Sequence, residues 1–513
     1  MDLKESNVIE YGWRRVAVTF AVVAATLLEI VDTTIVNVAL PNIQGNFGVA
    51  VDQGAWIVTG YIIANVIVIP LTPWLQQRFG RRAYYLASIG IFTVASLMCG
   101  LAGSFETLVF WRIIQGIGGG GLLSTSQSIL RETYPLSEQG TASGIFAMGV
   151  IVGPTAGPLI GGIITDQLSW RWAFFVNLPV GIVAALLVWL VLRNPAAPER
   201  KRLDWVGLGL LATGLGAMQF VLDQGQTKDW FSDAGIRLGT ALCAAGLAGF
   251  ILWTLRSSIP IVDLRVLKYR AVAAGCVLGG VLGVSLYGSI VVLPQYVQDS
   301  LSFTATASGE LILTRALAIA ALTPLVAIIA SRNLVDARVL VGSGFAIVGI
   351  SNWMLSSVTT MDSGFWTFTA SLIVGGVGLS MVFVPLSMAV LGAVPASEVP
   401  KAAAFFNLSR QVGGSIATAL LVTLFSRGLA SHQTVLSGGM ALHDNPIWNY
   451  LQVHGGQFSS SALQQLYSLL VDQATVLSYA DTSRAVAILS ILLAPLVFLM
   501  RRPRGTTSPL VSE

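Results

Sequence analysis

The chain has 513 residues, of which 54% are hydrophobic and only 11% are charged, and its mean hydropathy is +0.75. Soluble domains contain about 25% charged residues, so a chain this poor in charge cannot cover its own surface in water. The composition therefore predicts a polytopic membrane protein. The three cysteines all lie in apolar runs, and such an odd set predicts neither a disulfide framework nor a metal site.

Apolar runs of the length that a helix needs to cross a bilayer, about 20 residues, recur along the whole chain. We expect about fourteen spans. Their expected limits are 16–40, 53–75, 83–102, 106–130, 140–164, 172–193, 204–222, 235–256, 271–294, 307–330, 337–356, 364–392, 401–426 and 484–500. The first run is too long for the apolar core of a signal peptide and lacks a convincing cleavage site, so it is expected to be a retained span.

Basic residues gather in alternate loops between these runs. With the N-terminus inside, the N-terminus and the cytoplasmic loops hold about 21 of the basic residues and the outer loops about five. This bias and the even number of spans predict a multi-pass protein of the cell inner membrane with both termini in the cytoplasm. The net charge of +4 is then a topology signal that favours contact with lipid headgroups, and no nucleic-acid partner is expected.

Two acids lie inside the first apolar run, in "TLLEIVDTTIVNVALP" at residues 26–41. A charge at mid-bilayer costs roughly 2.5 to 3.5 kcal/mol on insertion scales, so such residues usually have a function. Glu29 and Asp32 share a helix face, and two carboxylates in low-dielectric surroundings disfavour ionising together. At least one is expected to bind and release a proton near neutral pH. The alternatives are a hydrogen-bonded structural acid at Glu29 and a gate lock at Asp32.

Three arginines, Arg112, Arg315 and Arg410, also fall within spans and are candidates to pair with these acids. In the fourth span, "FWRIIQGIGGGG", Arg112 and Gln115 lie on one helix face. Arg112 is expected to be a proton-relay or structural cation, and the alternative is an arginine that extends to the outer interface. In the thirteenth span, Asn407, Arg410 and Gln411 form another polar face, which would serve either a substrate cavity or helix packing.

The fifth span, "GIFAMGVIVGPTAGPLIGG", contains a glycine every four residues: Gly149, Gly153, Gly157 and Gly161. This spacing predicts a stripe without side chains that lets another helix approach closely. Pro154 and Pro158 each remove a backbone donor and are expected to bend the helix.

Together these stretches resemble the major facilitator superfamily, and within it the EmrB/QacA-like drug:proton antiporters with fourteen spans. The residues that carry the resemblance are "VDTTIVNVALP", "WLQQRFGRR", "RIIQG", "GVIVGPTAGPLIGG" and "NLSRQVGGSIA". The basic loop "WLQQRFGRR" implies gating or structural roles for Arg78, Gly80 and Arg81, and the fifth-span motif implies the same for Gly153, Pro154, Gly157 and Pro158. The loop departs from the family pattern at Gln77, where an acid is usual, and at Pro73, where a glycine is usual.

The resemblance implies an all-α membrane fold of two six-helix pseudo-repeat halves with two inserted central helices. We expect an N-terminal half at 1–193, the inserted pair with its loops at 194–270 and a C-terminal half at 271–513, which includes an external loop at 428–482. The implied function is proton-coupled multidrug efflux of lipophilic compounds by alternating access. No cofactor is expected, because the proton gradient supplies the energy.

The expected proton-coupling residues are Asp32, Glu29 and Arg112, and Asp32 is favoured as the carrier because it lies in the first-span motif. The expected substrate cavity combines polar span residues with aromatic ones: Asn37, Gln115, Phe146, Tyr287, Asn407, Arg410 and Gln411. Small lipophilic drug-like compounds, protons and membrane lipids are the expected partners. A periplasmic membrane-fusion adaptor with an outer-membrane channel is a further expected partner, for which the external segment is the candidate surface.

Other functions stay open at this point. The chain could export one endogenous lipid or metabolite, import its substrate, or act mainly by assembling with an adaptor. An enzyme is not expected, because no catalytic motif or nucleotide-binding loop occurs. His432, His443 and His454 are spaced by eleven residues, but no cysteine or clustered acid supports a metal site there.

Overall fold

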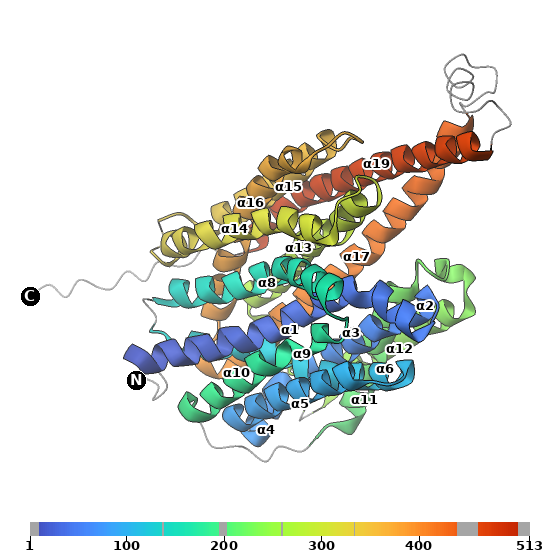
Figure 1. The fold of residues 1–513 in the computed structure, drawn as a ribbon. Coiled ribbons are helices and arrows are strands. Elements are labelled where there is room, and N and C mark those ends of the chain that lie inside the picture. Colours follow the sequence, from blue (N-terminus) through green and yellow to red (C-terminus); the bar gives the residue numbers. More distant parts are fainter. Residues whose placement is uncertain are drawn as a thin grey trace, which may run out of the picture.

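The structure is a computed structural model, and it describes residues 10–135, 138–193, 203–257, 260–332, 334–438 and 460–500. Within these ranges the chain is a bundle of helices (Figure 1). In the described part of the chain, eleven helices are long and apolar enough to cross a membrane. The three other expected spans correspond to α8, α13 and the consecutive helices α6 and α7, so the predicted all-α membrane fold is confirmed. The division into two halves and an inserted pair stays a prediction.

The helices up to the sixth expected span begin and end as follows: α1 (Gly12–Phe47), α2 (Val51–Gly54), α3 (Trp56–Val68), η1 (Ile69–Leu71), α4 (Thr72–Phe79), α5 (Arg81–Leu101), α6 (Phe105–Gly119), α7 (Leu122–Thr133), α8 (Gln139–Gln167), α9 (Trp172–Phe175) and α10 (Asn177–Val191).

The remaining helices follow: α11 (Trp205–Gln224), η3 (Trp230–Ser232), α12 (Ala234–Arg256), η4 (Leu264–Lys268), α13 (Arg270–Asp299), α14 (Ala305–Ser331), α15 (Ala337–Ser357), α16 (Phe365–Gly392), η5 (Ala396–Glu398), α17 (Val399–Gly438), α19 (Ser460–Leu493) and η6 (Ala494–Leu499).

Glycine and proline explain the breaks within two spans. The second span is α3, the 3₁₀ turn η1 and α4, and Pro70 and Pro73 stand in the first turns of η1 and α4, where a missing N–H is tolerated. The fourth span stops at Gly119 and resumes at Leu122 after two more glycines. By contrast, α8 continues through Pro154 and Pro158. Breaks of this kind are acceptable at membrane depth where the freed backbone groups face protein or a cavity.

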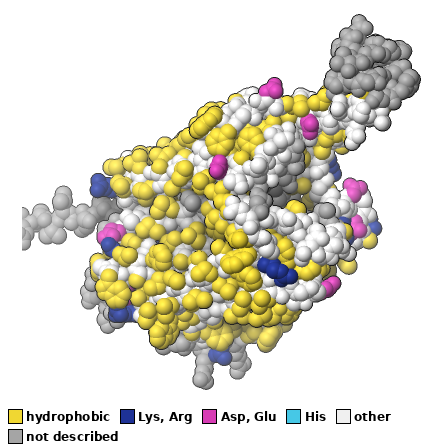
Figure 2. Space-filling view, viewed as in Figure 1, with side chains coloured by type: hydrophobic (Ala, Val, Ile, Leu, Met, Phe, Trp, Pro, Cys, Tyr) yellow, Lys and Arg dark blue, Asp and Glu magenta, His cyan; other side chains and the backbone are white. Residues whose placement is uncertain are grey.

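The helix contacts place α8 at the centre of the bundle. It packs along α1 on one side and α14 on the other, while α13 packs along α17. The helices α11 and α12 pack on each other, and α11 also contacts α3 and α17. Hydrophobic side chains cover much of the visible surface (Figure 2), and large exposed ones such as Leu186, Trp189 and Ile251 fit a lipid-facing surface.

We call the end of the bundle where α1 begins the proximal end, and the end where α1 finishes, near Phe47, the distal end. The proximal half is closed by a buried apolar cluster that includes residues of α1, α7, α8, α13, α16 and α17. Within it the Phe146 and Phe383 ring centroids lie 6.2 Å apart, and those of Phe383 and Phe406 lie 6.3 Å apart. These rings join α8, α16 and α17 at the closed end.

The segment expected as an external loop at 428–482 is largely helical where it is described. The helix α17 runs on to Gly438 and α19 begins at Ser460, so both flanks of the expected loop continue the spanning helices. These two helices project together beyond the bundle (Figure 1). His432 of α17 contacts Asp481 of α19 at 2.8 Å, which ties the two helices together. His443 and His454 lie outside the described residues.

Candidate functional site

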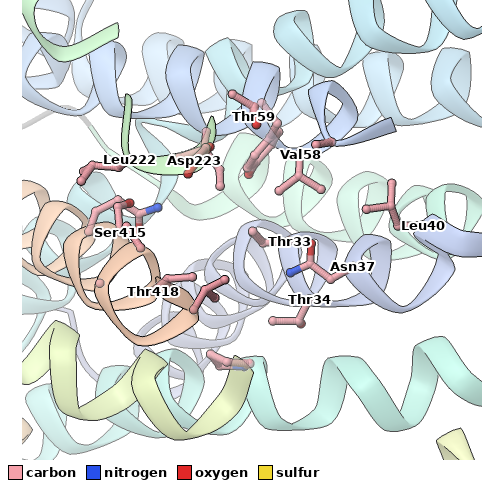
Figure 3. A pocket seen from close by; sticks show the side chains of 18 of the residues that line it. Thr33, Thr34, Asn37, Leu40, Val58, Thr59, Leu222, Asp223, Ser415 and Thr418 are labelled. Carbon is pink, nitrogen blue, oxygen red and sulfur yellow. The ribbon is translucent and has the colours of Figure 1, made fainter. Parts of the chain in front are cut away.

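A cavity of about 610 Å³ extends from mid-depth of the bundle toward the distal end (Figure 3). Its wall on α1 runs from Glu29 to Pro41, and on α3 from Val58 to Asn65, with Ala55 just before that helix. The helices α8, α11, α13 and α17 complete the lining, together with Leu123 of α7. Because the proximal half is packed, the cavity is accessible from the distal side in this conformation.

Glu29 lies at the inner end of this cavity and is 7% exposed. Asn65 Nδ2 donates to Glu29 Oε1 at 3.1 Å, and the backbone N–H of Leu123 donates to Oε2 at 3.1 Å. Leu123 stands in the first turn of α7, where N–H groups lack partners within the helix. The glycine break in the fourth span thus creates a helix N-terminus inside the bundle, and Glu29 binds to it.

Asp32 lies one turn further along α1 but does not line the cavity. Its carboxylate is fully buried, and Arg112 Nη1 donates to Oδ2 at 2.6 Å. Gln115 Nε2 donates to Oδ1 at 2.9 Å and Asn177 Nδ2 donates to the same oxygen at 2.8 Å. Donors from α6 and α10 therefore enclose the Asp32 carboxylate of α1. Which of the two acids exchanges the proton stays a prediction.

Arg112 is fully enclosed as well. Its Nε donates to the Ile57 carbonyl at 3.1 Å, and Nη1 also donates to Gln115 Oε1 at 2.7 Å. The guanidinium carbon lies 4.3 Å from the centroid of the Tyr61 ring, a cation–π contact. Arg112 thus pairs with an acid inside the bundle and does not extend to the membrane interface.

The structure separates the predicted cavity residues into groups. Asn37, Arg410 and Gln411 line the cavity. Gln115 belongs to the Asp32 network instead. Phe146 is 1% exposed and packs at the closed proximal end, so in this conformation it does not line the cavity.

Two further predicted cavity residues have other surroundings. Asn407 is fully buried next to the cavity, where its Nδ2 donates to Gln127 Oε1 at 2.8 Å. This bond links α17 to α7 just proximal to Arg410 and forms part of the closed end. Tyr287 belongs to α13, but its side chain lies outside the described residues.

The basic loop makes a tight turn between α4 and α5. Gly80 has φ +82°, which favours glycine, and Arg81 forms an ion pair with Glu132 of α7. Arg78 stands in the last turn of α4, where a cation is favourable. The loop is thereby tied to the fourth span at the proximal end.

The glycine stripe of α8 faces α1, as a stripe of this kind predicts. A Cβ on Gly157 would lie 1.8 Å from Thr34 Oγ1, and one on Gly153 would lie 2.8 Å from Ile30 Cγ2. At Gly149 the nearest atom, Thr26 Cγ2, would be 3.7 Å away, which is ordinary contact. The same helix presents Pro154 and Pro158 to the cavity.

Among the side chains of the site that were not predicted from the sequence are Asn65, Asn177 and Asp223. The expected seventh span ended at residue 222, which placed Asp223 in a loop, whereas α11 continues to Gln224 and Asp223 lines the cavity. Asn65 and Asn177 were not recognised because single amides in apolar runs carry no spacing signal. The group at Asp32 becomes evident only when α6 and α10 are placed beside α1.

A helical membrane bundle with a cavity at mid-depth, an acid at its inner end and packing that closes one side has the features of a secondary transporter. The family model described as Major Facilitator Superfamily matches residues 22–418, and the chain belongs to this family.

The chain is 32% identical over 497 residues to "Multidrug export protein EmrB" of Escherichia coli K12, covering 96% of this chain and 97% of that protein. It is 33% identical over 503 residues to "Fatty acid resistance protein FarB" of Neisseria gonorrhoeae, covering 95% and 96%. The solved structure of the human organic anion transporter MFSD10 (TETRAN) matches with a TM-score of 0.57 at 13% identity, covering 93% of this chain and 99% of that one. The chain is thus an EmrB-like transporter of the superfamily.

Proposed function

We propose that this protein is a proton-coupled multidrug efflux transporter of the inner membrane, with both termini in the cytoplasm. The relationship to a protein named as a multidrug exporter over nearly the whole chain supports efflux. The single observation that carries proton coupling is the Glu29 carboxylate, which is buried at mid-depth and still borders the cavity. An acid in this position can exchange a proton with the cavity and sense whether a substrate is present.

In the proposed mechanism, the Glu29 carboxylate interacts with either the substrate or a proton. In the inward-open state, a lipophilic substrate enters from the cytoplasm or the inner leaflet while Glu29 is deprotonated. The halves then rock to open the distal side, which is the external side in this topology. A proton from outside binds Glu29, the substrate leaves, and the protonated carrier returns and releases the proton inside. No cofactor is needed, since each proton contributes about 2.3 kcal/mol per 100 mV of membrane potential.

Asp32 and Arg112 have a different part in this proposal. Their ion pair holds α1 against α6, so that Glu29 keeps a fixed position at the cavity while the proton moves. Replacing either partner would leave the other as an uncompensated buried charge. We therefore propose Asp32 and Arg112 as positioning residues, and Glu29 as the group that exchanges the proton.

Transport by purified protein in liposomes tests the proposed function. An imposed inward proton gradient, applied from the distal face, should accelerate efflux of a fluorescent lipophilic compound, and an uncoupler should abolish the acceleration. Equal rates with and without a pH difference or voltage contradict the proposal.

A second experiment addresses the substrate range. A resistance panel of cationic, neutral and anionic compounds separates a multidrug exporter from an exporter of one endogenous lipid or metabolite, because only the former protects against several chemical classes.

The paired helices α17 and α19 support a second role, assembly with a periplasmic membrane-fusion adaptor and through it an outer-membrane channel. These helices project beyond the bundle at the distal end (Figure 1) and are joined by the His432–Asp481 contact. Deleting residues 435–472 tests this role. Lost resistance in cells, with transport in isolated vesicles intact, supports docking, whereas unchanged resistance of cells that have an outer membrane contradicts it.

A further inference from the structure

The helix pair α11–α12 supplies a carboxylate to the cavity that the proposed transport cycle does not use. Asp223 lies one residue before the end of α11 and lines the cavity. Figure 3 shows it beside Thr59 on one wall, with Thr33 and Asn37 of α1 on another. Gln219 Nε2 donates to Asp223 Oδ1 at 2.8 Å. The Thr59 side chain also interacts with this carboxylate, but the other oxygen, Oδ2, is buried and forms no hydrogen bond of ordinary geometry among the residues that the structure describes.

The position of Asp223 follows from how α11 is held. The Trp56 ring of α3 stacks on Phe220 of α11 with centroids 5.9 Å apart. Beyond the end of α11, Trp230 Nε1 donates to Thr423 Oγ1 of α17 at 3.2 Å. The end of α11 is thus fixed to both α3 and α17, which form facing parts of the cavity wall. A side chain here is held at the cavity edge and is not free to turn away into solvent.

The charges around the cavity are unequal. Its lining contains two carboxylates, Glu29 and Asp223, and one guanidinium, Arg410. Glu29 already accepts hydrogen bonds at both oxygens. Asp223 has an oxygen without a hydrogen bond of ordinary geometry and forms no ion pair within the described ranges. A carboxylate at membrane depth is costly to leave without a cation, so this wall is suited to a positive group.

Beside the polar residues Thr59, Gln226 and Thr227, the wall also contains apolar side chains. Leu222, Val58 and Ile62 lie on the side of α11 and α3, and Val38 and Val422 lie on α1 and α17. A ligand that satisfies both features has one positive charge and an apolar body. We infer that Asp223 is a specificity-determining residue that binds the positive group of lipophilic monocations, and that α11 thereby gives the cavity its charge preference.

This inference deepens the proposed efflux function and rests on it, but binding can be measured without transport. Full-length protein in lipid nanodiscs is titrated with tetraphenylphosphonium and with its neutral relative triphenylphosphine oxide. The wild type should bind the cation more tightly. In Asp223→Asn the ratio of the two affinities should fall about tenfold or more, because the carboxylate charge is lost while the shape is kept. Asp223→Glu should restore most of the ratio.

Asp229→Asn is the matched control, since Asp229 is exposed in the turn after α11 and outside the cavity lining. It should leave the ratio at the wild-type value. Binding of the neutral compound to Asp223→Asn reports that the variant is folded. An unchanged ratio in Asp223→Asn, or a wild type with no preference for the cation, overturns the inference. The proposed function is tested separately, and it is contradicted if wild-type transport does not respond to a proton gradient.

Discussion

Glu29 and Asp32 lie three residues apart on α1, yet only the Glu29 carboxylate lines the cavity. Asp32 is fully buried and forms an ion pair with Arg112 at 2.6 Å. The two carboxylates at membrane depth are therefore stabilised by different partners. Asp32 has a cation and two amide donors, whereas Glu29 has an amide and the N-terminus of α7. We therefore propose a structural role for Asp32 and proton exchange for Glu29.

The first prediction concerns the ion pair. Asp32→Asn should lower the free energy of unfolding by roughly 3 to 5 kcal/mol, because it leaves the Arg112 guanidinium buried without an opposite charge. Thermal unfolding in detergent, followed by intrinsic tryptophan fluorescence, measures the loss. Glu106→Gln serves as the control, since Glu106 is exposed in the first turn of α6.

A double variant tests whether that loss arises from the pair. Combining Asp32→Asn with Arg112→Met removes both charges, so part of the lost stability should return. If Asp32→Asn unfolds at the wild-type temperature, or if the two substitutions are simply additive, the ion pair does not hold α1 against α6 in the way described.

The second prediction concerns the packing of α8 on α1. Gly157→Ala would place a Cβ 1.8 Å from Thr34 Oγ1, so α1 and α8 must separate. Transport should fall about tenfold or more, with a loss of stability of about 1 to 3 kcal/mol, as is typical of overpacked sites. Gly149→Ala, eight residues earlier on the same face of α8, is the matched control, because the nearest atom there would be 3.7 Å from the new Cβ. Equal transport rates in the two variants would mean that close approach at Gly157 is unimportant.

The third prediction concerns the closed proximal end. Asn407→Ala removes the hydrogen bond to Gln127, which is worth about 1 kcal/mol, and should shift the conformational equilibrium away from the distal-open state about fivefold. A cysteine at Ser415, which lines the cavity, reports this shift through its labelling rate with a membrane-impermeant thiol reagent added on the distal side. The native cysteines are replaced beforehand.

The labelling rate should fall in Asn407→Ala and stay at the parental value in Gln465→Ala, a change on the exposed face of α19. A faster or unchanged rate in Asn407→Ala would show that this bond does not favour the distal-open state.

Much of the fold could be predicted from the sequence, because apolar length and glycine spacing are local properties. The run at 26–41 identified the acidic helix, and the four-residue glycine period in the fifth span identified a face for close packing, which the structure places against α1. The polar face of Arg410 and Gln411 was visible as a helical spacing and does lie at the cavity. The expected two-half division, in contrast, rests on resemblance alone.

The different surroundings of Glu29 and Asp32 could not be predicted, because they depend on helices distant in the sequence. Asn177 is 145 residues from Asp32, and Leu123 is 94 residues from Glu29. Asp223 was placed in a loop because hydropathy ends a span at its first charge, although a carboxylate can stay within a helix that borders a cavity. Hydropathy likewise did not predict that α17 and α19 extend past the apolar runs, since polar composition does not by itself end a helix.

In the proposed cycle substrate and proton compete for Glu29, and substrate-induced proton release measures this competition. Substrate is added to purified protein in weakly buffered detergent solution, and a pH indicator follows the released protons. By linkage the wild type and Glu106→Gln should release about one proton per bound substrate, while Glu29→Gln should still bind substrate and release none. Proton release that persists in Glu29→Gln would contradict this role of Glu29, because another group would then carry the proton.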